Sequence, residues 1–263
     1  MGAAMARVTW ERIAPWLSVI AVALAWELTA RSGVVTPFML PRLSVVLARI
    51  WSDFASGGLA QSLALTLYRA LTGFFIAAAI GIPLGILIAR NRVVRWFFDP
   101  IVSVGFPMPK IAFLPIVTLW LGYHDVSKIS MVVLDAVFPV LTATIAGTAG
   151  VDREILWSAR NLGASERQML REIILPAALP EILTGLQVAL PIALIVCIVA
   201  EMTMGGVGLG GSMVTASRFA DSPGVFAGIV EIAAVGYVLV KLMAVLRSRL
   251  LVWHQEALAP ATV

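Results

Sequence analysis

Four ionisable residues stand inside long apolar stretches of this sequence: Lys110, Asp135, Glu201 and Glu231. In hydrocarbon such a side chain costs about 2.5–3.5 kcal/mol on insertion scales, so it usually faces the interior of a helix bundle or a cavity. We therefore expect the three acids either to line a pathway for solutes or to make structural hydrogen bonds between helices. Lys110 is the cation best placed to attract an anion. The alternative is that its aliphatic chain extends until the ammonium group reaches the membrane surface.

Three prolines surround Lys110. Pro107, Pro109 and Pro115 interrupt the helical hydrogen-bond ladder there. Such breaks are tolerated in membranes where the backbone lines a cavity. The segment is therefore a candidate part of a translocation pathway, and a simple kink is the alternative.

Glu201 and Met202 directly precede five glycines between residues 205 and 211. This cluster lacks the Gly-Lys-Ser/Thr ending of a phosphate-binding loop, and no strand precedes it as a dinucleotide fold requires. We interpret it as a flexible or tightly turned connection on the outer side, whose functional role would be that of an outer gate. Because an acid is a poor ligand for an anion, we expect Glu201 to hold this gate through a polar or ionic partner.

No combination of residues in the sequence predicts catalysis or a metal centre. The two histidines, His124 and His254, fall in different connections, and neither has a partner at metal-ligand spacing. The single cysteine, Cys197, excludes a disulfide framework and a cysteine-based metal site. We therefore expect a chain that is not an enzyme.

The elements that position these residues are expected to be helices that cross a membrane. Apolar residues make up 60% of the chain and charged residues 13%, whereas a soluble domain has about 25% charged residues. This composition excludes a soluble globule, a disordered chain and a fibrous repeat. A spanning helix needs about 20 apolar residues, and six stretches qualify: Ile13–Ala30, Ala70–Ala89, Pro100–Tyr123, Ile129–Val151, Ile182–Ala200 and Ser222–Val240.

The fold class is therefore an all-α polytopic membrane protein with about six transmembrane helices. We expect one integral domain over residues 1–263, with its core at about 62–250. The first apolar stretch is longer than the apolar region of a signal peptide and no clean cleavage site follows it, so a retained helix is favoured.

The basic residues indicate the orientation of these helices. With the N-terminus inside, eleven arginines lie in the inner segments, against four arginines and one lysine in the outer segments. This bias predicts that both termini are cytoplasmic, in a bacterial inner (plasma) membrane. The net charge of +4 does not indicate nucleic-acid binding, because the basic residues form no face interleaved with aromatic residues.

Two connections are too long to be simple turns. Between residues 41 and 60, apolar side chains at Leu43, Val46, Leu47 and Ile50 have helical spacing. They predict a helix on the membrane surface or packed against the bundle. The other connection is a cytoplasmic loop over residues 150–181, which holds five acids and four arginines in a chain otherwise poor in charge.

This cytoplasmic loop is expected to form two short helices. Asp152 is a favourable N-cap for a helix over residues 153–162, and Gly163 suits the left-handed position that ends it. A capping-box pattern over residues 165–168 starts the second helix, which we expect Pro176 to stop.

One face of the first short helix is apolar, with Ile155, Leu156, Ala159 and Leu162 at helical spacing. Leaving such a face uncovered is costly. A docking partner is therefore expected, and a solvated connector is the alternative.

The same loop resembles the coupling loop of ABC importer permeases, whose pattern is E-A-A-x3-G-x9-I-x-L-P. Gly163, Ile173, Leu175 and Pro176 stand at the family's spacing. Trp157 and Ser158 replace the first two residues of the pattern, and Glu154, one turn earlier, could substitute for the missing acid. By this resemblance the residues that couple to an ATPase are Glu154, Ile155, Ser158, Ala159, Leu162, Gly163, Ala164, Ile173, Leu175 and Pro176.

The resemblance extends from about residue 25 to residue 250. Several short runs resemble segments of the nitrate, sulfonate, taurine and bicarbonate permeases. These runs are Gly81–Gly85, Asp99-Pro100, Ser127–Ile129 and Ala200–Met202. This implies the type I ABC importer permease fold and alternating access for a small solute, such as one of these oxyanions.

The same resemblance implies the partners of the chain. They are two cytoplasmic ATPase subunits, which would bind ATP and Mg²⁺, a second permease copy in a homodimer, and a periplasmic or lipid-anchored solute-binding protein, besides membrane lipid. The chain itself would carry no cofactor. The alternative class is a secondary transporter or channel without an ATPase, which predicts inverted repeats and leaves the charged cytoplasmic loop unexplained.

Overall fold

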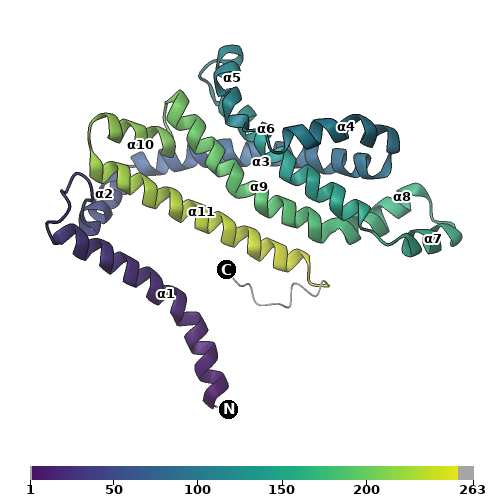
Figure 1. The fold of residues 1–263 in the computed structure, drawn as a ribbon, viewed down its shortest axis with the longest axis horizontal. Coiled ribbons are helices and arrows are strands. Elements are labelled where there is room, and N and C mark those ends of the chain that lie inside the picture. Colours follow the sequence, from purple (N-terminus) through teal and green to yellow (C-terminus); the bar gives the residue numbers. More distant parts are fainter. Residues whose placement is uncertain (1, 254–263) are drawn as a thin grey trace.

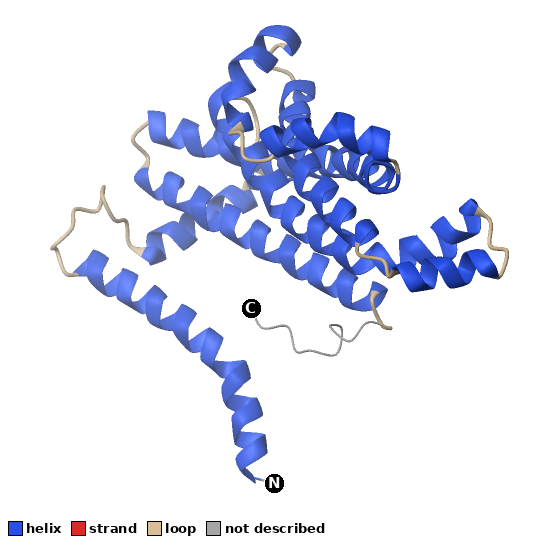
Figure 2. Cartoon of the chain, turned by 45° about the vertical axis from the view of Figure 1, so that its right-hand side comes forward, coloured by secondary structure: helices blue, strands red, loops and turns tan. Residues whose placement is uncertain are grey.

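The computed structural model describes residues 2–253, and the side chains of residues 17–253. Over this range the chain is helical and contains no strand (Figures 1 and 2), which confirms the predicted fold class. The elements are α1 (Gly2–Arg31), α2 (Leu43–Ala55), α3 (Gly58–Arg90), α4 (Arg92–Gly105), the 3₁₀ turn η1 (Lys110–Phe113), α5 (Leu114–Leu121), α6 (Asp125–Ala149), α7 (Arg153–Asn161), α8 (Glu166–Gln168), the π-helix η2 (Met169–Ile174), α9 (Leu175–Met204), α10 (Leu209–Arg218) and α11 (Ser222–Leu250).

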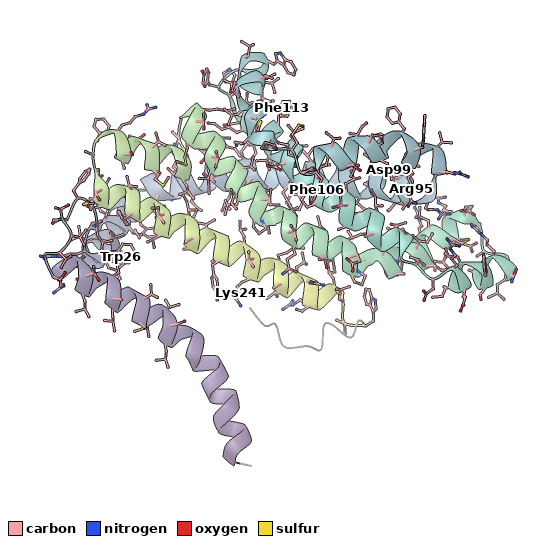
Figure 3. All side chains as sticks on the ribbon, viewed as in Figure 1. Trp26, Arg95, Asp99, Phe106, Phe113 and Lys241 are labelled. Carbon is pink, nitrogen blue, oxygen red and sulfur yellow. The ribbon has the colours of Figure 1, made fainter. Side chains whose placement is uncertain are left out.

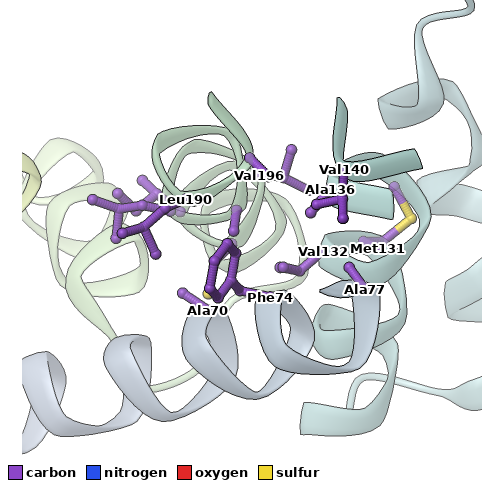
Figure 4. Close-up of a cluster of buried hydrophobic side chains, with 14 of the residues drawn as sticks. Ala70, Phe74, Ala77, Met131, Val132, Ala136, Val140, Leu190 and Val196 are labelled. Carbon is purple, nitrogen blue, oxygen red and sulfur yellow. The ribbon is translucent and has the colours of Figure 1, made fainter. Parts of the chain in front are cut away.

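The centre of the molecule is a bundle of α3, α6 and α9, against which α11 packs (Figure 1). Small residues at the contacts bring the helix backbones close together, as is usual for helices packed in membranes. A Cβ added to Gly73 of α3 would lie 2.5 Å from Val132 of α6, and one added to Gly185 of α9 would lie 2.5 Å from Ala143. Buried apolar side chains fill the remaining space between the three helices (Figure 4).

Among the described residues, four helices are long and apolar enough to cross a membrane: α3, α6, the continuous run Glu166–Met204, and α11. They contain four of the six predicted spans. A fifth crossing is formed if α4 and the η1–α5 segment are counted as one bent span.

The prolines predict an interruption within the apolar stretch Pro100–Tyr123, and the structure has a break there. The chain breaks between α4 and η1, and the two halves meet at 90°, with α5 projecting from the bundle (Figure 1). The reason is the pair Pro107 and Pro109, which lack the N–H groups that would continue the helical ladder. The two prolines therefore turn the chain sharply at this point.

The first predicted span, Ile13–Ala30, falls in α1, where the side chains of residues 2–16 lie outside those described. Helix α1 leaves the bundle at one end (Figure 1). It is attached there through Trp26, whose indole Nε1 donates to the Pro41 carbonyl at 2.9 Å and whose ring lies 5.5 Å from that of Phe226. The crossing of the membrane by α1 stays a prediction.

The predicted surface helix is α2. Its Val46 is fully buried, whereas Leu47 is exposed. Arg49 of α2 donates from Nη1 to Asp221, just before α11, at 2.7 Å. Helix α2 is thereby fixed against the bundle.

The predicted loop of two short helices contains α7 and α8. We call residues 153–168, which hold both helices, the α7 loop. Gly163 has φ +83°, and the capping box between Ser165 and Gln168 is formed. Asp152 precedes α7 as expected, but its side chain makes no capping hydrogen bond.

The expectation that Pro176 stops the second helix is wrong. Helix α8 continues through the π-helix η2 into α9, which also contains Pro180 and Pro191. Pro176 lies in the first turn of α9, where a missing N–H removes little from the ladder. The chain therefore runs as one helical rod from Glu166 to Met204.

A buried charge network and the α7 loop

Glu201 lies in the last turn of α9 and is fully buried. Its carboxylate accepts hydrogen bonds from the Arg69 guanidinium at 2.6 Å, from the Thr66 hydroxyl at 2.9 Å and from the backbone N–H of Gly210 at 3.1 Å. A buried ion is tolerated only when it is paired and its remaining lone pairs are satisfied. These three donors meet that requirement.

Arg69 of α3 is the centre of this network. Its Nη1 also donates to the Val207 carbonyl at 2.7 Å, and its Nε donates to Asp125, the first residue of α6, at 2.8 Å. A guanidinium has five N–H donors in a fixed plane, so one side chain can hold several partners at once. Arg69 thereby ties α3, α6, α9 and the chain after α9 together.

The turn over residues 205–208, which we call the glycine turn, is held by two further bonds. Lys128 of α6 donates from Nζ to the Gly205 carbonyl at 2.8 Å. The backbone N–H of Leu209, at the end of the turn, donates to the Thr66 hydroxyl at 2.9 Å. Side chains from α3 and α6 therefore fix a turn that belongs to neither helix.

Glycine is required at position 208 of this turn. Gly208 has φ +152°, and an added Cβ would lie 2.4 Å from the Glu201 carboxylate. Both the left-handed backbone and the lack of space exclude a side chain there. The network and the glycine turn therefore depend on one another.

The structure gives Glu201 an ionic partner, as the sequence predicts, whereas its role in gating stays a prediction. Met202 is half-buried and packs against the apolar core. Sequence reasoning missed Arg69, Thr66 and Asp125. Arg69 stands at the edge of an apolar span, which is a weak signal, and only the packing of α3 against α9 brings it to Glu201.

Lys110 and Asp135 form a separate pair at the break between α4 and α5. Lys110 is only 6% exposed, lies 3.2 Å from the Asp135 carboxylate and donates to the Phe106 carbonyl at 3.0 Å. Its Nζ also lies 4.6 Å from the centroid of the Phe138 ring, and Figure 3 shows Phe106 at the break. Lys110 is thus turned into the protein rather than extended to a membrane surface.

The three prolines near Lys110 are exposed on the surface of the described chain. Pro115 lines a cavity of about 440 Å³ together with Thr118, Leu119 and Thr203. Glu231 takes part in neither charged cluster. It lines a different cavity, and no residue of the described chain donates a hydrogen bond to its Oε1.

The α7 loop is joined to the bundle through Glu166. This residue forms ion pairs with Arg90, at the end of α3, and with Arg160 of α7 at 3.6 Å. Glu154, Ser158 and Gly163 are exposed, whereas Ala164, Ile173 and Leu175 are half-buried and Pro176 is exposed.

The apolar face of α7 is divided between two surroundings. Leu162 is 88% exposed and Ile155 is also exposed, but Ala159 is buried within the chain. The four apolar residues expected to form one docking face are therefore not all open to a partner, because Leu156 is half-buried and Ala159 is buried. Trp157, at the position of the family's glutamate, is exposed.

Comparison with known proteins identifies the family. Residues 81–252 match the sequence profile of the "binding-protein-dependent transport system inner membrane component" family. The taurine transport system permease protein TauC of Escherichia coli (strain K12) is 35% identical over 236 residues, covering 88% of this chain and 86% of that protein. A putative aliphatic sulfonates transport permease protein, SsuC of Bacillus subtilis (strain 168), is 34% identical over 231 residues, covering 88% and 84%.

Solved structures share the fold at lower identity. A chain of the MetNI methionine ABC transporter in an inward-facing conformation matches with a TM-score of 0.56 at 19% identity, covering 71% of this chain and 96% of that chain. A chain of a bacterial ABC transporter that imports alginate matches with a TM-score of 0.61 at 15% identity, covering 92% and 98%. The profile match and the curated relatives together show that this chain belongs to the binding-protein-dependent transport system inner membrane components, the multi-pass permease subunits of ABC importers.

Proposed function

We propose that this permease imports a small sulfonate-type oxyanion, and that movement of the α7 loop controls the glycine turn. The observation that carries the coupling is that ion pairs join α3 at two places to the continuous helical run Glu166–Met204. At one end the Arg69–Glu201 pair joins them, and near the other Arg90 of α3 pairs with Glu166 of the α7 loop.

Helix α9 supplies the mechanical link between these two places. It has 30 residues, which corresponds to about 45 Å at 1.5 Å per residue. It is continuous with η2 and α8, so a displacement of the α7 loop is transmitted along a rigid rod. The network that receives it is buried and fully bonded, and such clusters change between discrete arrangements rather than deforming gradually.

This arrangement supports an ATPase as a partner of the chain. The exposed side chains of Ile155 in α7 and of Leu162 directly after it offer the docking surface for a cytoplasmic ATPase subunit, in which ATP and Mg²⁺ would be bound. A homodimer of the permease would then need two ATPase subunits. The glycine turn would face the outer side, where a solute-binding protein delivers the solute, and both termini would be cytoplasmic.

The solute class rests on the relatives and on Lys110. The two curated relatives described above are named for the transport of taurine and of aliphatic sulfonates. Lys110 is a buried cation beside the broken segment, with Asp135 as its partner. In our proposal Pro107, Pro109, Pro115 and Met202 lie along the pathway, and Lys110 exchanges Asp135 for the anionic solute during transport.

Reconstitution of the permease with its ATPase and binding protein into proteoliposomes tests this function. We expect ATP-dependent uptake of radiolabelled taurine or ethanesulfonate that Lys110→Ala lowers at least tenfold. Arg92→Ala, which removes an exposed cation of α4, is the matched control and should transport normally. ATP-dependent uptake of other solutes but of no sulfonate would refute the solute class, and failure to bind any ATPase would refute the coupling.

A further inference from the structure

A cavity of about 400 Å³ lies where α2, the start of α3, α10 and α11 meet. This volume is within the range of about 300–1,000 Å³ found for small-molecule sites. Gly206, Val207 and Gly208 of the glycine turn form part of its wall, whereas Glu201 and Arg69 do not line it. The cavity is therefore next to the charge network but is a separate site.

One face of α11 shapes this cavity. Gly224, Gly228 and Glu231 line it and recur at the spacing that places residues on one side of a helix. At the two glycines α10 approaches closely: a Cβ on Gly224 would lie 3.0 Å from the Ala216 Cβ, and one on Gly228 would lie 3.2 Å from Met213. Glu231 is thus the first large side chain that this face of α11 presents to the cavity.

Glu231 has an unused acceptor. Its Oε1 is shielded from solvent and, in the described part of the chain, no donor reaches it. A shielded oxygen without a donor is unfavourable, because the water that it has lost is not replaced. Because Glu231 lines the cavity, its carboxylate would gain the missing donor by turning toward a ligand that carries an N–H group.

The charge of the cavity wall also favours a cation. Arg49 is the basic residue among those lining it, and this guanidinium is already bonded to Asp53 at 3.0 Å and to Asp221 at 2.7 Å. Burial lowers the pKa of Arg49, but the hydrogen bonds and charges of the two aspartates outweigh this effect and raise it. With Glu231 ionised, three carboxylates face one guanidinium, so two negative charges remain unbalanced.

Two of the three hydroxyl-bearing residues in the wall, which are Ser62, Ser212 and Thr215, act as acceptors as well. Ser212 and Thr215 of α10 each donate their proton to a backbone carbonyl of their own helix at 2.9 Å, which leaves only their lone pairs for a ligand. No group of three or more metal-ligating side chains occurs in the described part of the molecule. A cation that donates N–H bonds therefore fits this wall better than a metal ion does.

We propose that this cavity binds a primary ammonium group, with the Glu231 carboxylate as its main acceptor. The ammonium group belongs either to a free amine or to a solute that carries an amino group together with another charge. The inference goes beyond the proposed function, since it holds whether or not the transported solute is a sulfonate.

Three small molecules of matched size test the proposal on the purified permease–ATPase complex in lipid nanodiscs. Binding of radiolabelled ethylammonium is measured by equilibrium dialysis at constant ionic strength, in competition with ethanesulfonate and with taurine. We expect saturable binding of one ethylammonium per permease, at least tenfold tighter than that of ethanesulfonate. If taurine competes with ethylammonium, the natural ligand is a solute that carries an amino group together with another charge. If taurine does not compete, the natural ligand is a free amine.

Two variants assign the binding to this cavity. Glu231→Gln removes the charge, and Thr215→Phe fills the space without changing the charge, so each should weaken ethylammonium binding at least tenfold. The controls are Asp99→Asn and Ser217→Phe, which change exposed residues outside the cavity and should bind as the unmodified chain does. No saturable binding in the unmodified complex, or unchanged binding in both Glu231→Gln and Thr215→Phe, would overturn the proposal. Sulfonate uptake, measured in parallel, reports separately on the proposed function.

Discussion

At the scale of single residues, the central feature is a buried ion pair whose polar atoms are all occupied. Glu201 has three kinds of donor, and Arg69 distributes its own donors over Glu201, Asp125 and a backbone carbonyl. Such a pair adds little stability compared with a well-packed apolar pair, but removal of one partner leaves an uncompensated charge in the interior. The network therefore acts mainly to fix one arrangement of the helices.

Removal of the cation from this network is expected to be severe. Arg69→Met leaves Glu201 buried without its counter-charge, so we expect the free energy of unfolding to fall by about 3–5 kcal/mol. Asp125→Asn should cost less than about 1 kcal/mol, because the Asp125 side chain is 45% exposed. Thermal unfolding of the purified complex measures both, with Arg95→Met as a control on α4 (Figure 3). Equal losses of unfolding free energy in Arg69→Met and Asp125→Asn would contradict the view that Glu201 depends on Arg69 for its counter-charge.

A second prediction concerns Gly163 between α7 and α8. Its φ is +83°, and nothing lies within 4 Å of an added Cβ, so a substitution acts through backbone strain alone. Gly163→Val should cost about 1–3 kcal/mol locally, displace α7 and reduce co-purification of the ATPase. Gly163→Asn should retain the ATPase, because asparagine tolerates the left-handed conformation. If both variants bind the ATPase equally well, the turn is not what positions α7.

At the scale of elements, the segment from α4 to α5 departs most from a simple spanning helix. Its two prolines produce a break, and the 90° bend brings Lys110 inward to Asp135 while α5 projects from the bundle. Breaks of this kind are stable in a membrane only where protein or a cavity covers the freed backbone groups. The segment is therefore the part of the chain best suited to line a pathway.

Single cysteines test whether this segment lines the pathway. In a Cys197→Ser background, which removes a buried thiol, cysteines at Met108, Ile111 and Leu119 should react with small thiol reagents. The reactivity at Met108 and Ile111 should change when a non-hydrolysable ATP analogue is bound to the complex. A cysteine at Val238, on the exposed side of α11, is the control that should not respond to the nucleotide. Identical reactivity in both states at all positions would favour a static kink.

At the scale of the whole molecule, the chain has two functional ends joined by α3 and α9. The α7 loop lies at one end and the glycine turn with α10 at the other (Figure 1). An importer that couples ATP hydrolysis inside to solute entry outside needs this separation. The basic residues of the sequence predict that the α7 loop lies on the inner side.

Reporter fusions test this orientation. Fusions after Arg95, within residues 163–172 and after Arg249 should report a cytoplasmic location, whereas a fusion near Arg218 should report the outer side. The physical reason is the excess of arginine in the segments that stay inside. An outer signal from residues 163–172 would remove the ATPase from reach of α7 and reject the coupling proposal.

The fold class, the family and the local form of the α7 loop could all be predicted from the amino-acid sequence. These depend on short-range chemistry: apolar runs long enough to span a membrane, the left-handed Gly163, and the capping box of Ser165 with Gln168. The same local reasoning failed at Pro176, because a proline in the first turn of a helix does not stop it.

Only the tertiary structure decided which charged residues meet. Arg69 and Glu201 are 132 positions apart, and no local pattern links them, because their contact depends on the packing of α3 against α9. The burial of Ala159 and the cavity around Glu231 also depend on how distant helices pack together. A buried polar side chain is stabilised by whichever partner the assembled helices bring within reach, and that partner is fixed by packing across the whole bundle.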